Sequence, residues 1–335
     1  MRRLALLALL AAPAAIGPAP VSPARADAVF VLNSSDPSIQ VIDPETRREL
    51  RRLPVLREPH HLVLTPARDL LLIADSGGNE IHFVDPNTGE VRKRERVANP
   101  YHLDFTPDGK MLVVTGLRRD QVDLYNWDGA NLTLAGRVRP GDMPSHIAFR
   151  PDSSMAYITV QGNRRVTAVN LRTREVAWSA EVGREPAGII WHNDRLLVGV
   201  MGSDHIAVLN PETRQVERRI FIGRGAHAIF PSPTDGRLYV TSRVDSRITA
   251  LDARTLDPVR TYEVPGGPDC LSFDPQGRIW VTLRWARQLG MFDPRTGEVQ
   301  TSPVGRSPHG VHYQPGARVQ DIGIGTPTAA LRPQG

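Results

Sequence analysis

The chain has 335 residues and a formal charge of +5, with 41 Lys and Arg against 36 Asp and Glu. Arg2, Arg3 and Arg25 lie in the first 26 residues, which contain no carboxylate, so the remainder carries only +2. This small net charge is compatible with neutral and anionic ligands, and it gives no argument for nucleic-acid binding. The single cysteine, Cys270, excludes an intramolecular disulfide.

Residues 1–26 are predicted to be a secretory signal peptide. Arg2 and Arg3 form a positive start, residues 4–16 an apolar stretch, and residues 24–26 (Ala-Arg-Ala) a small-x-small cleavage site. The apolar stretch is too short and too interrupted by proline to span a bilayer, and no later apolar run approaches that length. We therefore expect cleavage after residue 26 and a periplasmic or secreted, monomeric product with no membrane span.

One sequence unit then recurs about every 40 residues. It begins with a Pro-x-His-like triplet and continues through short β-rich segments that are separated by tight turns and polar loops. The third members of the triplets stand 39 to 44 residues apart: His61, His102, His146, Gly188, His227, Cys270 and Gly310. Four short strands per unit are typical of one blade of a β-propeller.

The two ends of the chain predict how the ring closes. Six units are complete, whereas residues 307–313 supply only a first strand and residues 28–55 only the strands that should follow it. Pairing both ends in one blade removes the open sheet edges of the ring. We predict an all-β seven-bladed β-propeller of four-stranded antiparallel blades over residues 27–314, followed by a poorly ordered, Gly- and Pro-rich tail at 315–335.

Acidic and amide side chains recur at the turn between the third and fourth strands, as in Asp-Pro-Glu-Thr at 43–46 and Asn-Pro-Glu-Thr at 210–213. A short Asp or Asn side chain there can accept hydrogen bonds from the backbone two residues further on. We interpret this series as structural turns rather than as metal ligands.

The repeat resembles the YVTN-type β-propeller family. The resemblance rests on the Pro-x-His start, the Pro-Asp-Gly turn at 107–109, the Tyr-Ile-Thr-Val and Tyr-Val-Thr-Ser strands at 157–160 and 239–242, and the Asp-x-x-Thr turns. It covers nearly the whole chain after residue 26. It implies a YncE-like secreted or periplasmic propeller, distantly similar to the d1-haem domain of nitrite reductases and to lactonase-type propellers. The resemblance implies no single activity.

The triplets also predict the contents of the channel mouth, because the first strand of each blade runs along the central axis. Four histidines in equivalent positions could converge there, and imidazole is a preferred ligand of Cu, Zn and Fe. The metal hypothesis is that three or four of these histidines bind one such ion: His61, His102, His146 and His227. The alternative is that they bond only to backbone groups or water, because His or Gly fits the entry to the first strand.

A second set of residues on this face suits an anionic ligand. His60, Tyr101 and His309 form a dense sector on adjacent blades, and the loops between second and third strands carry arginines and an aromatic residue: Arg118, Arg164, Arg243, Arg284, Arg287 and Trp285. Arginine binds acid groups, and tryptophan offers a flat stacking surface. A small anionic ligand, a protein partner or, more weakly, single-stranded nucleic acid would fit this pattern. The alternative is solvated arginine from a compositional bias.

Three functions stay open at this point. The chain has no G-x-S-x-G, H-E-x-x-H, phosphate-loop or dinucleotide-binding motif. We favour a non-catalytic binding or scaffold protein that uses the channel mouth. The alternatives are a metal-dependent lyase, lactonase or oxidase with the histidine ring around its metal, and a carrier or maturation factor for a cofactor such as d1-type haem.

Overall fold

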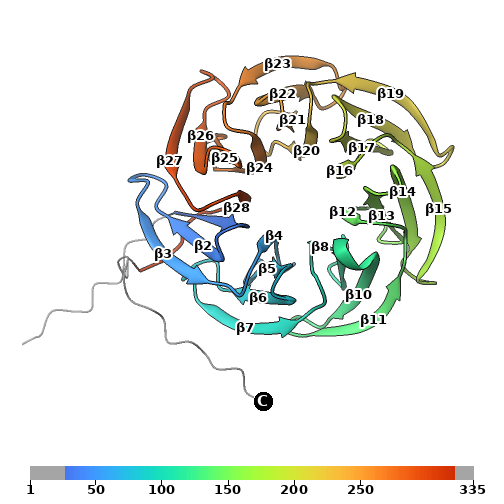
Figure 1. Cartoon of the computed structure of the whole chain (residues 1–335), viewed down its shortest axis with the longest axis horizontal. Coiled ribbons are helices and arrows are strands. Elements are labelled where there is room, and N and C mark those ends of the chain that lie inside the picture. Colours follow the sequence, from blue (N-terminus) through green and yellow to red (C-terminus); the bar gives the residue numbers. More distant parts are fainter. Residues whose placement is uncertain (1–26, 321–335) are drawn as a thin grey trace, which may run out of the picture.

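A computed structural model describes residues 27–320 and confirms the predicted seven-bladed β-propeller (Figure 1). Each blade is a four-stranded antiparallel sheet, and the first strands surround the central axis. Blade 1 is closed as predicted by both ends of the described chain, since β28 (Pro308–Gln314) pairs with β1 (Ala28–Asn33). It continues with β2 (Ser38–Ile42) and β3 (Glu49–Pro54).

The other six blades follow in chain order. Blade 2 contains β4 (Pro59–Leu64), β5 (Leu71–Asp75), β6 (Glu80–Val84) and β7 (Val91–Arg96). Blade 3 contains β8 (His102–Phe105), β9 (Met111–Gly116), the short 3-10 helix η1 (Leu117–Arg119), β10 (Gln121–Trp127) and β11 (Leu132–Val138). Blade 4 contains β12 (Pro144–Phe149), β13 (Met155–Val160), β14 (Arg165–Asn170) and β15 (Glu175–Glu181).

The last three blades repeat this arrangement. Blade 5 contains β16 (Pro186–His192), β17 (Arg195–Val200), β18 (His205–Asn210) and β19 (Gln215–Phe221). Blade 6 contains β20 (Ala226–Pro231), β21 (Arg237–Ser242), β22 (Arg247–Asp252) and β23 (Pro258–Glu263). Blade 7 contains β24 (Pro268–Phe273), β25 (Ile279–Leu283), β26 (Gln288–Phe292) and β27 (Val299–Pro303).

The hydrophobic core lies between the blades. Every residue of β5 and β6 is buried, because both faces of these middle strands pack against neighbouring sheets, whereas the outermost strand β7 contains no fully buried residue. Tyr157 of blade 4 packs in one cluster with Leu196 and Val198 of blade 5. Since the apolar side chains fill these layers between sheets, polar side chains can occupy the axis.

The hydrogen bonds confirm the prediction of structural turns. Asp43 Oδ1 accepts from the N–H groups of Glu45 (2.8 Å) and Thr46 (3.0 Å). Asn210 Oδ1 accepts in the same way from the two N–H groups that follow Pro211, at 2.9 and 3.1 Å. The acceptor oxygens are thus used by the turn itself.

Buried threonines on second strands hold the first strand of the next blade. Thr115 Oγ1 donates to the carbonyl of Ser145 (2.6 Å), and Thr282 Oγ1 donates to that of His309 (2.6 Å). Thr241 Oγ1 donates to the carbonyl of Asp269 at 3.0 Å. Because all three threonines are fully buried, these bonds fix the height at which each strand enters the channel.

The segment after β28 remains in contact with blade 1. The Gly316 N–H donates to Asp27 Oδ1 (2.8 Å), and Ala317 is buried in the core cluster beneath it. The sequence predicts a poorly ordered tail from residue 315, but Gly316, Ala317 and Val319 pack against the propeller. The rest of the predicted tail and the predicted signal peptide lie outside the described residues. No helix within residues 27–320 is long and apolar enough to cross a membrane.

Candidate functional site at the channel mouth

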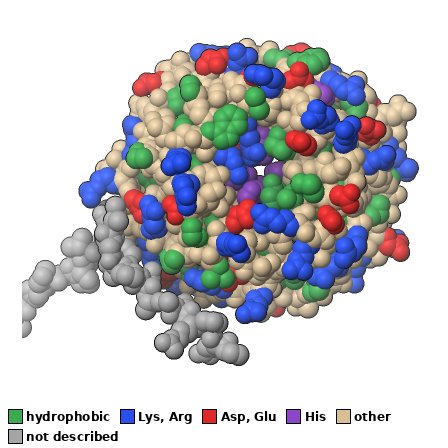
Figure 2. Space-filling model, viewed as in Figure 1, with side chains coloured by type: hydrophobic (Ala, Val, Ile, Leu, Met, Phe, Trp, Pro, Cys, Tyr) green, Lys and Arg blue, Asp and Glu red, His purple; other side chains and the backbone are tan. Residues whose placement is uncertain are grey.

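Six histidines from five blades form one contiguous cluster on the axis. Blade 2 contributes two of them, and blades 3, 4, 6 and 1 contribute one each: His60, His61, His102, His146, His227 and His309. Ring centroids of neighbouring imidazoles lie 3.8 to 6.0 Å apart, from the stacked His60–His309 pair to the His227–His309 pair. Figure 2 shows histidine side chains at the central opening, with Lys or Arg side chains beside them.

Two blades contribute glycine to this ring for a steric reason. A Cβ on Gly188 would lie 2.6 Å from the Cα of Ala228 and 2.7 Å from the carbonyl oxygen of His227. A Cβ on Gly310 would lie 3.0 Å from the carbonyl oxygen of His60. The ring is therefore asymmetric, because neighbouring backbone and, at Gly310, the Leu32 side chain occupy the space that a side chain would need.

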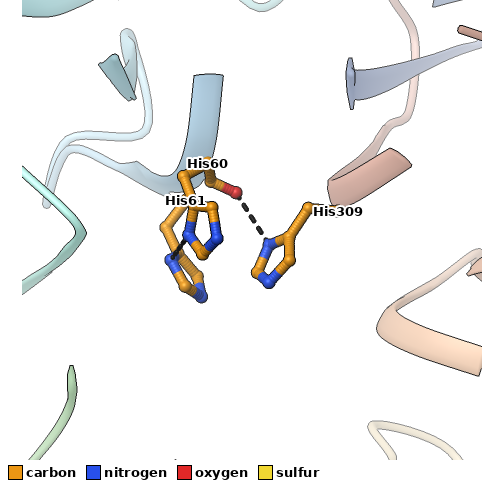
Figure 3. Close-up of side chains that lie close together, drawn as sticks. All are labelled: His60, His61 and His309. Carbon is orange, nitrogen blue, oxygen red and sulfur yellow. Dashed lines mark hydrogen bonds between the residues drawn. The ribbon is translucent and has the colours of Figure 1, made fainter. Parts of the chain in front are cut away.

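The sector predicted around His60, Tyr101 and His309 is brought together. The His60 ring stacks on His309 and lies 4.2 Å from the Tyr101 ring, centroid to centroid. His309 Nδ1 donates to the carbonyl of His60 (2.9 Å), and His60 Nδ1 lies 2.8 Å from His61 Nδ1 (Figure 3). This packing fixes the relative positions of the three rings.

The hydrogen bond of His61 determines which of its nitrogens is available. His61 Nδ1 lies 2.8 Å from the carbonyl oxygen of Tyr101. A carbonyl only accepts, so Nδ1 carries the proton and the neutral ring keeps its lone pair on Nε2. Among residues 27–320, no group forms a hydrogen bond with His61 Nε2, and the same is true of His102 Nδ1 and His146 Nε2. Three adjacent rings thus each present one buried nitrogen without a partner.

Charged side chains of blades 6 and 7 form an ionic network that contacts the other side of the histidine cluster. Asp269, which is fully buried, accepts from Arg243 Nε (2.9 Å) and from Arg284 Nη1 (3.2 Å). Arg243 Nη2 in turn lies 2.8 Å from His227 Nε2 and 3.3 Å from His309 Nε2. A guanidinium only donates, so it occupies the lone pairs of these two histidines.

Because of this network, the four histidines of the metal hypothesis differ in their hydrogen bonding. His61, His102 and His146 each keep a nitrogen without a partner, whereas His227 accepts from Arg243 through Nε2 and places its Nδ1 3.0 Å from the Asp269 carboxylate. In residues 27–320, the groups of three whose ligand atoms lie within 4.8 Å of one another are different sets: His60, His61 and His309; His227, Asp269 and His309; and Asp75, Glu80 and His82. The predicted quartet is therefore adjacent but does not converge on one point.

The predicted arginine rim also divides into parts. Arg243 and Arg284 lie in the buried network, whereas Arg118 pairs with Glu58 at 2.8 Å on the surface. Arg164 lines a separate surface pocket between blades 4 and 5, together with Arg184. Arg287 follows the exposed Trp285, which is 56% accessible, in the loop of blade 7. These residues therefore lie in different surroundings.

Sequence reasoning missed a cleft between blades 2 and 3. It has a volume of about 770 Å³, within the usual range for ligand pockets, and its walls include Arg57, Arg119 and Arg139 in addition to Arg118. Arg57 and Arg139 belong to the connections between blades, which also reach the mouth face. The sequence signal for this cleft was an arginine shortly before the Pro-x-His start of two repeats, at residues 57 and 139.

Burial keeps the ring uncharged at neutral pH. Desolvation is the largest cause that lowers the pKa of each of the six imidazoles below 6.5, and for His102 it lowers the pKa to about 3. A neutral imidazole is the form that binds a metal or a haem iron. Burial likewise raises the pKa of Cys270, so this thiol is not a reactive thiolate.

These lowered pKa values predict that the protein loses stability in acid. The unfolded chain binds protons to these histidines below about pH 6.5, whereas the folded ring does not, so the free energy of unfolding decreases as the pH falls. Each such group contributes about 1.4 kcal/mol per pH unit below 6.5 until its folded pKa is reached. Urea unfolding between pH 7.5 and 5 measures this slope; equal midpoints throughout that range would contradict it.

Fold and site together define a class: β-propeller scaffolds with an imidazole-lined channel mouth. The chain belongs to the YncE-like β-propeller family, whose model matches residues 4–317. It is 23% identical to protein NirF of Pseudomonas aeruginosa over 323 residues, covering 88% of this chain and 71% of NirF.

Solved structures show the same fold at low identity. A protein of unknown function from Desulfotomaculum acetoxidans superposes with a TM-score of 0.72 at 13% identity, covering 85% of this chain and 98% of that one. The dihydro-heme d1 dehydrogenase NirN in complex with DHE superposes with a TM-score of 0.63 at 15% identity, covering 90% and 77%. At these identities, the likeness supports the architecture alone.

Proposed function

We propose that this protein is a periplasmic, non-catalytic carrier that binds an anionic iron tetrapyrrole, of the d1-haem type, at its channel mouth. The observation that carries the proposal is the lone pair of His61 Nε2, which is buried on the axis and has no hydrogen-bond partner within residues 27–320. The periplasmic location rests on the predicted signal peptide.

The residues present fit such a ligand. An iron tetrapyrrole, when bound, offers an open iron position to an imidazole and acid groups to cationic side chains. His61 is held in the required tautomer by the Tyr101 carbonyl, and burial keeps its ring neutral by lowering its pKa. The exposed Trp285 and the arginines of the mouth add an aromatic surface and positive charge around the opening.

One of the comparisons agrees with this class of ligand. The structural neighbour NirN is described as a dihydro-heme d1 dehydrogenase in complex with DHE. The identities to NirF and NirN are 23% and 15%, so the proposal is argued from the chemistry of the mouth.

A second candidate is a transition-metal site without a macrocycle, which would suit a metal-dependent enzyme. The observation that favours it is the group of His60, His61 and His309, whose ligand atoms lie within 4.8 Å of one another. All three of these rings, however, are already bonded through Nδ1, and Arg243 lies at His309 Nε2. Copper, zinc or iron would therefore have to displace existing hydrogen bonds.

A spectroscopic titration tests the proposal. Iron protoporphyrin IX is added to the full mature protein, and the main haem absorption band is followed at neutral pH. We expect saturation at one haem per chain with a spectrum typical of histidine ligation. No spectral change with haem, together with one tightly bound Cu, Zn or Fe ion per chain in elemental analysis, would instead favour the second candidate.

A further inference from the structure

The cleft between blades 2 and 3 carries positive charge that the protein itself does not neutralise. Four arginines and one glutamate line it, a local charge of +3: Arg57, Arg118, Arg119, Arg139 and Glu58. The glutamate pairs with Arg118. Within residues 27–320, none of the other three arginines has a carboxylate at ion-pair distance.

The floor of this cleft is rigid and already bonded. Asn99, 5% exposed, donates from Nδ2 to the Ser76 carbonyl (3.0 Å) and accepts from the Arg118 N–H (2.8 Å). Its own N–H donates to Asn79 Oδ1 at 2.9 Å. These bonds connect the loops of two blades, so the arginines stand on a preorganised base, which lowers the entropic cost of binding.

One polar atom in the cleft wall lacks a partner. Ser76 is 2% exposed and lines the cleft, and its Oγ forms no hydrogen bond with any group in the described part of the chain. A buried hydroxyl without a partner is unfavourable unless a ligand or water completes it. A hydroxyl donor beside several guanidinium groups is suited to a carboxylate oxygen.

The cleft is next to the densest part of the histidine cluster. Glu58 lies two residues before His60, and Asn99 lies two residues before Tyr101, so the segments that lead into β4 and β8 connect the cleft with the axis. A ligand with a flat centre on the axis and acid groups along one edge could contact both regions.

We propose that this cleft is a carboxylate-binding subsite that holds the acid groups of the ligand. The inference rests on the proposed function and makes it more specific: the ligand class is a tetrapyrrole with free carboxylates on one edge. The histidine cluster binds the centre, and the cleft selects the acid over its neutral derivatives.

The test is a thermodynamic cycle between protein and ligand. Iron protoporphyrin IX and its dimethyl ester, which lacks the acidic groups, are titrated into the wild type and into the double variant Arg119→Gln/Arg139→Gln. We expect the ester to bind the wild type about 10-fold more weakly than the acid, since one charged hydrogen bond contributes about this factor. The double variant should lose about 10-fold for the acid and little for the ester.

The control removes one exposed arginine from the opposite face. Arg254 lies in the turn between β22 and β23, and the variant Arg254→Gln should leave the affinities for the acid and for the ester unchanged. Equal affinity of the wild type for acid and ester would overturn the subsite while leaving the proposed function intact, as would an equal loss for both ligands in the double variant. Failure of the wild type to bind either compound would overturn the proposed function and the subsite together.

Discussion

Replacing His61 with glutamine should weaken the binding of iron protoporphyrin IX about 100-fold and remove the spectrum of histidine ligation. His61 is the ring whose Nε2 lone pair is free and whose tautomer is fixed by a backbone carbonyl. Glutamine keeps much of the volume but offers no imidazole nitrogen. A loss of this size corresponds to about 2.7 kcal/mol. Absorption titration measures it.

His312→Gln is the matched control for this variant. His312 is also largely buried on a first strand, but its Nε2 bonds to Gln314 (3.0 Å), and burial likewise lowers its pKa. This variant should retain wild-type affinity and spectrum. If His61→Gln binds haem as the wild type does, His61 is not the axial ligand, and the main observation behind the proposed function is lost.

Replacing Asp269 with asparagine should destabilise the fold by about 3 kcal/mol. The carboxylate is fully buried and accepts hydrogen bonds from two guanidinium groups whose side chains are only 15% and 25% exposed. Removing one partner of a buried ionic network leaves the other charges uncompensated, which costs several kcal/mol. Urea unfolding at pH 7.5 measures the change.

The matched control for Asp269 is Asp245→Asn. Asp245 pairs with Arg224 at 2.7 Å, but the arginine side chain is 72% exposed, so water replaces the lost interaction and stability should change little. Similar stability of both variants would mean that the buried network contributes no more than a surface ion pair. Since Arg243 contacts His227 and His309, Asp269→Asn should also disturb the haem spectrum.

The sequence by itself determined the architecture and the composition of the channel mouth. The repeat spacing, the turn sequences and the first strand found only at residues 307–313 were sufficient for a closed seven-bladed ring, because each blade is a local four-stranded unit that must pack against two neighbours. Equivalent positions in the repeat also identified the histidines that meet on the axis, since blade symmetry brings such positions together.

Only the tertiary structure decided which of these side chains are available. Arg243 occupies His227 and His309, the Tyr101 carbonyl leaves His61 Nε2 free, and the backbone beside Gly188 leaves no room for a side chain there. Hydrogen bonds, tautomers and close approaches depend on atoms from blades far apart in the chain, and no repeat pattern encodes them. The cleft between blades 2 and 3 was missed for the same reason, because its walls come from two blades and exist only once these pack together.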